Sequence, residues 1–179
     1  MLNRFFGLLL VVFLVLSVAG VVFAQEKPGA EIKADKETKY GVGFQATFPA
    51  YGISGMMDIN EMISAQGIVG FFGNLNTYAV RGLYRFQQKN FWDLYGYGMV
   101  GAWSYTGLKV SNGSKLEETT ETVLGFGAGV GIEYDWRGWN SELPPLFWNL
   151  ELGLGFANFD AVDYNFSTLL FGAGVHYRF

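Results

Sequence analysis

The amino-acid sequence predicts an all-β protein that folds as an eight-stranded antiparallel up-and-down transmembrane β-barrel. Three observations lead to this prediction. Large apolar residues alternate with small or polar ones through most of residues 39–179, which is the pattern of strands with two different faces. Aromatic residues make up 18% of the chain and 25 of its 179 residues are glycine, both above ordinary usage. After residue 24, no segment shows the 3.6-residue period of an amphipathic helix.

Residues 1–24 are predicted to form a secretory signal peptide. Arg4 precedes a long run of Leu, Val and Phe, and the run ends in Ala24 at a cleavage pattern of the A-x-A type. A retained membrane anchor is the alternative, because the apolar run is about long enough to span a bilayer. Residues 25–38 carry seven charges without apolar periodicity, and this composition predicts a flexible leader.

The composition of the remaining chain excludes several classes of protein. Removal of residues 1–24 takes away one basic residue and no acidic one, which leaves 11 basic and 16 acidic residues. A chain with this excess of acidic residues offers no basic surface for binding nucleic acid. The chain contains no cysteine, so it has neither disulfides nor thiolate metal sites. We therefore expect no cofactor, no metal site and no nucleic-acid partner.

Four strands are predicted in the first half of the barrel. In residues 40–48, apolar side chains alternate with Gly, Gln and Thr. Residues 51–57 form a short strand bounded by turn-forming residues, and residues 62–72 place Ile, Ala, Val and Phe on one side. Residues 77–86 set Tyr, Val and Phe against two arginines and a leucine. Each segment has the period of two that a strand requires.

Four further strands follow. Residues 93–107 set Tyr, Met and Trp against Gly, Leu and Val. Residues 122–136 place large apolar side chains on one parity and four alternating glycines on the other. Residues 148–158 oppose Trp, Leu and Phe to Asn, Glu, Gly and Ala, and residues 166–179 end the chain with the same alternation. The total is eight strands joined by seven turns.

The two faces of these strands favour a membrane barrel over a soluble sandwich. The outer face of a sandwich carries polar and charged residues, whereas one face here is mostly glycine with a few charges. Aromatic residues concentrate at strand ends with Leu, Val, Ala and Phe between them, which is typical of an apolar belt with aromatic girdles. Backbone groups in lipid must all be hydrogen-bonded, so the sheet has to close. Eight strands make the smallest such barrel.

Over about residues 39–179 the sequence resembles the small eight-stranded outer-membrane barrels of the OmpA/OmpX type. The C-terminal strand carries apolar residues at alternate positions and ends in an aromatic-x-Phe pattern, Tyr177 and Phe179. The resemblance implies that these two residues are the signal read by the barrel-assembly machinery, and that the protein lies in a bacterial outer membrane among lipid and lipopolysaccharide. We expect a monomer. The sequence departs from the family in its connections, of which only 108–121 and 137–146 are long.

The inward-facing parity carries as many basic as acidic residues. The six are Arg81, Arg85, Arg178, Glu133, Asp135 and Glu151. Because unpaired charges in a narrow lumen are costly, this equality predicts a salt-bridge network; the alternative is independent charges hydrated by lumen water. Glycines take the same parity at 41, 43, 96, 98, 125–131, 153, 155, 172 and 174. They predict a nearly bare wall, toward which Arg81 and Arg85 extend to meet Glu133 and Glu151.

These observations predict a non-enzymatic integral outer-membrane barrel with a structural role and a narrow or gated pore. His176 is the only histidine, and the sequence places no nucleophile or metal ligand beside it, so we expect a hydrogen-bonded lumen histidine. Two alternatives remain. One is a binding or adhesion barrel that acts through loop 108–121. The other is an outer-membrane lipid hydrolase, which requires a serine beside His176 on an accessible face.

Overall fold

The computed structural model describes residues 39–47, 50–111, 115–159 and 164–179. The predicted signal peptide and leader, residues 1–24 and 25–38, lie outside the described residues. The strands are β1 (Tyr40–Thr47), β2 (Ala50–Asp58), β3 (Ile63–Phe72), β4 (Leu75–Gln88), β5 (Trp92–Ser111), β6 (Lys115–Asp135), β7 (Leu146–Phe159) and β8 (Tyr164–Arg178). A 3-10 helix, η1 (Trp136–Gly138), follows β6. Within the described part of the chain, no helix is long and apolar enough to cross a membrane.

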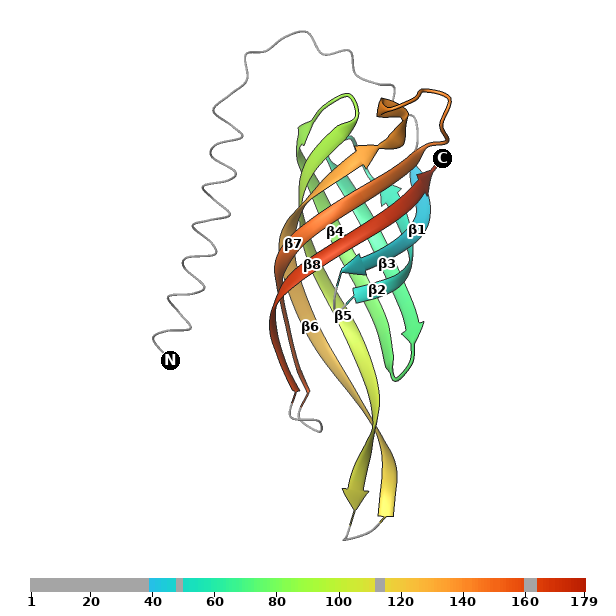
Figure 1. Cartoon of the computed structure of the whole chain (residues 1–179). Helices are drawn as coiled ribbons and strands as arrows, with labels where there is room; N and C mark the ends of the chain where they lie inside the picture. Colours follow the sequence, from blue (N-terminus) through green and yellow to red (C-terminus); the bar gives the residue numbers. More distant parts are fainter. Residues whose placement is uncertain (1–38, 48–49, 112–114, 160–163) are drawn as a thin grey trace, which may run out of the picture. The chain divides into compact units, whose positions relative to one another are not determined.

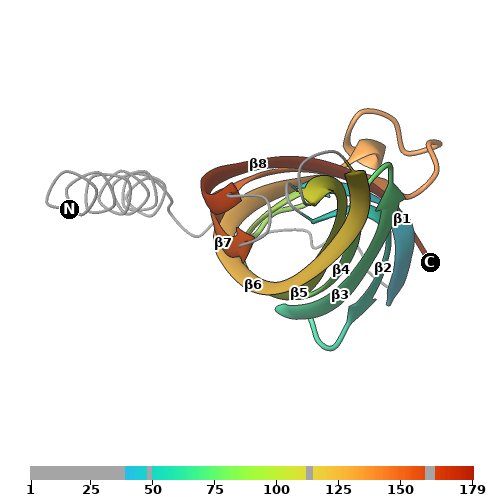
Figure 2. The same cartoon turned by 90° about the horizontal axis from the view of Figure 1, so that it is seen from below.

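Each strand pairs antiparallel with the next along the chain, and β1 pairs with β8 to close a barrel, as the view along the barrel shows (Figure 2). At this seam Tyr40 and Phe179 exchange two backbone hydrogen bonds of 3.0 and 2.9 Å. The predicted eight-stranded up-and-down β-barrel is therefore confirmed. Because the strand number is even, β1 begins and β8 ends at the same end of the barrel, which we call the terminal end.

The connections at the two ends follow from their residues. At the opposite end, β3 and β4 are joined by Gly73 and Asn74, and Gly73 has a φ of 61°, which glycine adopts without steric cost. At the terminal end, the side chain of Asn60 accepts hydrogen bonds of 2.8 Å from the backbone of Met62 and Ile63, which fixes the β2–β3 turn. The long connection predicted at 137–146 is also at this end and begins with η1.

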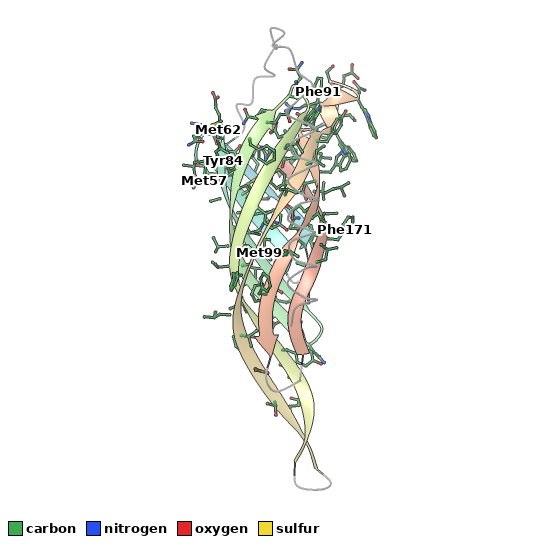
Figure 3. All side chains as sticks on the ribbon, turned by 90° about the vertical axis from the view of Figure 1, so that its left-hand side faces the viewer. Met57, Met62, Tyr84, Phe91, Met99 and Phe171 are labelled. Carbon is green, nitrogen blue, oxygen red and sulfur yellow. The ribbon has the colours of Figure 1, made fainter. Side chains whose placement is uncertain are left out.

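The outer surface of the barrel is a belt of exposed apolar side chains. Figure 3 shows Met57 and Phe171 projecting from the outside of the wall, and both are exposed. The belt includes Val42, Phe44, Ile53, Met57, Ile63, Val69, Phe71, Tyr78, Val80, Tyr84, Val100, Leu124, Phe126, Ile132, Leu150, Leu152, Phe156, Leu169, Phe171, Val175 and Tyr177. This area far exceeds the apolar patches of ordinary soluble proteins.

The inner face shows the inverse arrangement. Polar and charged side chains are buried there, among them Gln45, Ser54, Gln66, Arg81, Arg85, Glu133, Asn149, Glu151, His176 and Arg178. Of the charged side chains described on the barrel wall, those outside the far end of the β5–β6 hairpin all take this inner face. Buried charge is costly unless it is paired, so the interior must consist of compensating partners.

The face assignment predicted for the fifth strand is wrong. Tyr95, Tyr97, Met99 and Trp103 are buried in the lumen, whereas Gly96 and Gly98 take the outer parity. A Cβ atom at Gly131 would meet the ring of Tyr95 at 2.5 Å, one at Gly127 would meet Met99 at 2.7 Å, and one at Gly125 would meet Trp103 at 2.8 Å. The glycine row of β6 is therefore covered by the β5 side chains next to it and is not a bare wall.

The prediction that residues 108–121 form a long loop is also wrong. Strands β5 and β6 remain paired as far as Ser111 opposite Lys115, so most of the segment is a continuous hairpin. Pairing with β4 ends at Tyr105 opposite Leu75, and pairing with β7 begins at Gly125 opposite Ala157. The hairpin therefore extends well beyond the neighbouring strands (Figure 1). The backbone groups of the charged residues pair across the hairpin, so their charges do not prevent a strand.

Two glycines in neighbouring strands provide a test of the packing. A Cβ atom at Gly43 would collide with the carbonyl oxygen of Val175 and lie 2.7 Å from the Cα of His176, whereas one at Gly55 would meet no atom within 4 Å. We expect Gly43→Ala to lower the free energy of unfolding by roughly 1–3 kcal/mol, because backbone must move. Gly55→Ala is the matched control and should be neutral or slightly stabilising. Urea unfolding of both variants measures the difference; equal stabilities would contradict the packing.

Candidate functional site in the barrel interior

The first feature of the interior is a central cluster around Glu151 of β7. One carboxylate oxygen of Glu151 forms an ion pair with the guanidinium of Arg81 from β4 and accepts a 2.6 Å hydrogen bond from the Tyr95 hydroxyl. The other oxygen accepts hydrogen bonds from the Thr47 hydroxyl at 2.5 Å and from Gln45 at 3.2 Å. Arg81 also lies 4.2 Å above the ring of Tyr97. Side chains from β1, β4, β5 and β7 thus meet at one carboxylate.

A second group, the terminal-end cluster, comprises Asp58, Arg85, Asp93, Glu133 and Arg178. Arg178 of β8 contacts both oxygens of Glu133 at 2.7 and 2.9 Å, and it lies 3.3 Å from Asp58. Arg85 of β4 lies 3.0 Å from Asp58 and 3.4 Å from Asp93. Each arginine therefore contacts two carboxylates, and Asp58 links the two arginines.

Of the six charged residues predicted to face the lumen, the structure brings Arg81 to Glu151 and Arg178 to Glu133. Arg85 contacts Asp58 and Asp93 instead of Glu133 or Glu151. Asp135 does not join the lumen arginines; it forms a 2.7 Å ion pair with Arg137 of η1, and the hydrogen bonds between them raise the pKa of Arg137.

Three charged residues of these contacts are not predicted from the sequence: Asp58, Asp93 and Arg137. Asp58 lies just outside the strand predicted over residues 51–57, although it ends β2 on the inner parity of that strand. Asp93 has the parity of Tyr95, which was assigned to the wrong face. Charge balance could have identified both aspartates. At the terminal end Arg85 and Arg178 need acidic partners, and β2 and β5 supply acidic but no basic residues there.

His176 belongs to a third group with Ser54 of β2 and Gln66 of β3. Its Nε2 lies 2.5 Å from the Ser54 hydroxyl and 3.1 Å from the Gln66 amide. This is the buried, hydrogen-bonded environment that the sequence predicts for a lumen histidine. A serine does lie beside His176, but His176 is 0% exposed and Ser54 is 1% exposed. Among the described residues, Nδ1 of His176 has no hydrogen-bond partner, so the carboxylate of a catalytic triad is missing.

An apolar layer fills the interior toward the opposite end of the barrel. It consists of Ala50, Ile68, Ala79, Met99, Trp103 and Ala157. Ile68 follows Gln66 on the inner face of β3, and Met99 follows Tyr97 on β5, so the layer lies directly beyond the central cluster. Trp103 is 1% exposed. The polar clusters and this layer occupy successive levels of the lumen.

The C-terminal residues predicted as an assembly signal lie on the outer surface at the terminal end. Tyr177 and Phe179 are exposed and their rings stack, with centroids 6.3 Å apart. The ring of Phe179 also lies 6.3 Å from that of Tyr40 across the seam. Their place in the outer belt accounts for the apolar, alternating character of the last strand, and their role in assembly stays a prediction.

Among proteins of known structure, the chain is similar to outer-membrane barrels. The N-terminal β-barrel domain of Pseudomonas aeruginosa OprF is 14% identical, with a TM-score of 0.49, covering 79% of this chain and 96% of that domain. Yersinia pestis Ail in a phospholipid bilayer nanodisc is 15% identical, with a TM-score of 0.38, covering 80% of this chain and all of Ail. A second structure of Ail, in complex with the heparin analogue sucrose octasulfate, is 16% identical, with a TM-score of 0.38, covering 78% of this chain and 94% of that one.

At sequence identities of 14–16%, this likeness concerns the fold and carries no information about function. No protein-family model matches the chain, and no curated protein matches it. The closed eight-stranded barrel is the fold of the family that the sequence resembles. Among the described residues, no group of three or more His, Asp or Glu side chains is arranged to hold a metal ion.

Proposed function

We propose that the chain is a non-enzymatic, structural barrel of a bacterial outer membrane whose lumen is closed. The observation that carries this proposal is the inversion of its two faces. Exposed apolar side chains cover the outside, and the charged side chains of the wall are buried inside. In water this arrangement would expose a very large apolar surface, whereas in a bilayer it places that surface against lipid. The strand hydrogen bonds close on themselves, as a membrane requires.

The lumen is closed by two different barriers in series. The central and terminal-end clusters are ion-paired and buried, and eight strands leave an interior that side chains can fill. Beyond them lies the apolar layer with Trp103, whose side chains carry no charge to compensate a passing ion. An ion would have to displace both barriers. The gated pore predicted from the sequence therefore requires rearrangement of Trp103 as well as of the arginines.

Conductance in planar bilayers tests this proposal. We expect the parent protein, Arg81→Ala and Trp103→Ala to conduct little, because each retains one barrier. The double variant Arg81→Ala/Trp103→Ala should conduct clearly more than any of them, because it lacks both. Altered gel mobility without boiling checks that each variant has folded. A parent protein with a steady open channel would contradict the closed lumen.

A second candidate function, binding of another protein at the cell surface, is favoured by the β5–β6 hairpin. Its strands extend beyond β4 and β7, and within the described residues no barrel strand continues beside them. Paired hydroxyls join its two strands where the hairpin leaves the barrel: the hydroxyl of Ser104 lies 2.7 Å from that of Thr122, and the hydroxyl of Thr106 lies 3.0 Å from that of Thr120. An uncovered strand edge can pair with an extended segment of a partner. Shortening the hairpin should abolish binding to cells or matrix proteins while leaving the barrel folded.

The lipid hydrolase has little support. The pair formed by Ser54 and His176 faces the interior, on the side of the wall away from lipid, and is fully covered. A hydrolase acting on membrane lipid needs its nucleophile where an acyl ester can reach it. We propose that this pair serves the hydrogen bonding of the interior. Ser54→Ala should then leave lipid turnover unchanged.

A further inference from the structure

A shallow groove crosses the outer surface of the barrel from β1 to β6. It consists of two adjoining hollows of about 500 and 700 Å³, which share Gly67 of β3 and Val80 of β4. The first hollow reaches Tyr40 and Phe179 at the terminal end, and the second reaches Phe126 of β6. These six strands follow one another around the closed wall of eight (Figure 2).

The groove follows one line of directly opposed residues. From β1 to β6 these register partners are Val42, Gly55, Gly67, Val80, Val100 and Phe126. The next line toward the terminal end consists of small residues: Ala65, Gly82, Gly98 and Ala128. Toward the opposite end the exposed side chains of Val69, Tyr78 and Leu124 form a ridge along the second hollow. The groove is therefore a low strip of the wall beside a ridge.

The outward glycines of this strip are not required by packing within the chain. A Cβ atom at Gly55, Gly67, Gly82 or Gly98 would meet no atom within 4 Å. By contrast, a Cβ atom at Gly129 in the lumen would lie 2.3 Å from a backbone oxygen. Glycine weakens a strand, and it often marks a place where a ligand or another backbone comes close. Because the open side of these four residues faces outward, we look for such a group outside the barrel.

The chemistry and the course of the groove select its occupant. No charged residue lines either hollow, so the occupant is apolar. A rigid partner, whether a second barrel or a helix, contacts only a few strands of a wall that closes with eight, whereas the groove crosses six. A flexible hydrocarbon chain can follow the whole of it. The groove is also continuous with the apolar belt and opens at the terminal end, where the chain of a membrane lipid would enter.

We propose that the groove binds an acyl chain of a phospholipid whose headgroup lies at the terminal-end face of the membrane. The inference rests on the proposed membrane location. The chain lies over Gly55 and Gly67 and packs against the ridge, where it gains dispersion contacts on two sides. A chain on a flat part of the belt gains them on one side only. This phospholipid should therefore stay with the barrel longer than the lipids elsewhere around it.

Phosphatidylcholine with a photoactivatable diazirine in one acyl chain tests this proposal. The protein is reconstituted in vesicles that contain this lipid, illuminated and digested, and labelled residues are identified by mass spectrometry. We expect labelling to be several-fold higher at Val80 and Val100 in the groove than at Leu152 and Phe171, which are also exposed on the outer wall. After transfer to detergent, intact-protein mass spectrometry should detect one retained phosphatidylcholine.

Two variants that fill the groove and one control make this test specific. Gly67→Leu adds a side chain where a Cβ atom meets no neighbour, so it should lower labelling of the groove several-fold and release the retained lipid. Gly55→Leu is the second filling variant and should act in the same way; altered gel mobility without boiling checks that each variant has folded. Ala173→Leu enlarges an exposed residue of β8 outside the groove and should change neither result.

The outcomes separate this proposal from the membrane location. Even labelling around the wall that both filling variants leave unchanged would overturn the proposal, while the membrane location would stand. Labelling of Leu152 and Phe171 without labelling of the groove would also overturn it and would indicate that another protein covers the groove. Absence of labelling on the whole outer wall would overturn the membrane location and this inference together.

Discussion

Glu151→Ala should lower the free energy of unfolding by roughly 3–5 kcal/mol, the cost typical of breaking a buried ion pair at one end. Glu151 accepts hydrogen bonds from four side chains, and its loss leaves the Arg81 guanidinium buried without its carboxylate. Arg81 is 1% exposed, so water does not replace the lost partner without rearrangement. Urea unfolding of the reconstituted barrel, followed by tryptophan fluorescence, measures the loss.

Two further variants distinguish charge from hydrogen bonding in this prediction. Glu151→Gln keeps an acceptor for Tyr95 and Thr47 but removes the charge, so its loss of stability should be intermediate. Glu118→Ala changes an exposed carboxylate on the β5–β6 hairpin and should stay within about 0.5 kcal/mol of the parent. If Glu151→Ala behaves like Glu118→Ala, the central cluster does not stabilise the barrel.

Val80→Arg should be strongly destabilising in a bilayer, although Val80 is 62% exposed. It lies near the middle of β4 on the outer face, where an arginine would have to enter the apolar part of the membrane. The expected cost near the bilayer midplane is roughly 2–4 kcal/mol. At a water-exposed site the same substitution is nearly neutral. The free energy of unfolding in vesicles measures the cost.

Ile59 provides the matched control for Val80, because it is 60% exposed but lies in the β2–β3 turn at the terminal end. Ile59→Arg should cost no more than about 1 kcal/mol, since the guanidinium reaches water or headgroups there. Equal and small costs at the two positions would mean that the belt faces water, and the proposed membrane location would then be wrong.

Most of the fold could be predicted from the sequence, because alternation and turn residues determine strand number in an up-and-down barrel. The face of a strand does not follow from its sequence where both parities carry apolar residues. In β5, Tyr and Trp alternate with Gly and Leu, and the larger side chains were assigned to lipid. They lie inside because the glycine row of β6 gives them space. That space depends on which strand lies beside which, and β5 alone does not contain this information.

The interior could be predicted in part. Arg178 takes the place beside Glu133 that the sequence predicts for an arginine of β4. The pair formed by Arg81 with Glu151 follows from parity and from the cost of unpaired charge. The contacts of Arg85 do not, because Asp58 stands at a strand end where sequence alone cannot separate strand from turn. The Ser54 and His176 contact joins residues 122 positions apart and depends on the closure of β8 onto β1 and β2. Such contacts depend on the register of the closed barrel.

Gel mobility of the protein in washed outer membranes shows whether the chain is a closed barrel with its apolar face in lipid. Samples in SDS are divided, and one half is boiled. We expect the protein to be recovered in the outer-membrane fraction. Unboiled and boiled samples should migrate at different positions, because the closed sheet resists SDS until it is heated. Recovery in the soluble fraction, or identical mobility of the two samples, would contradict a closed barrel in lipid.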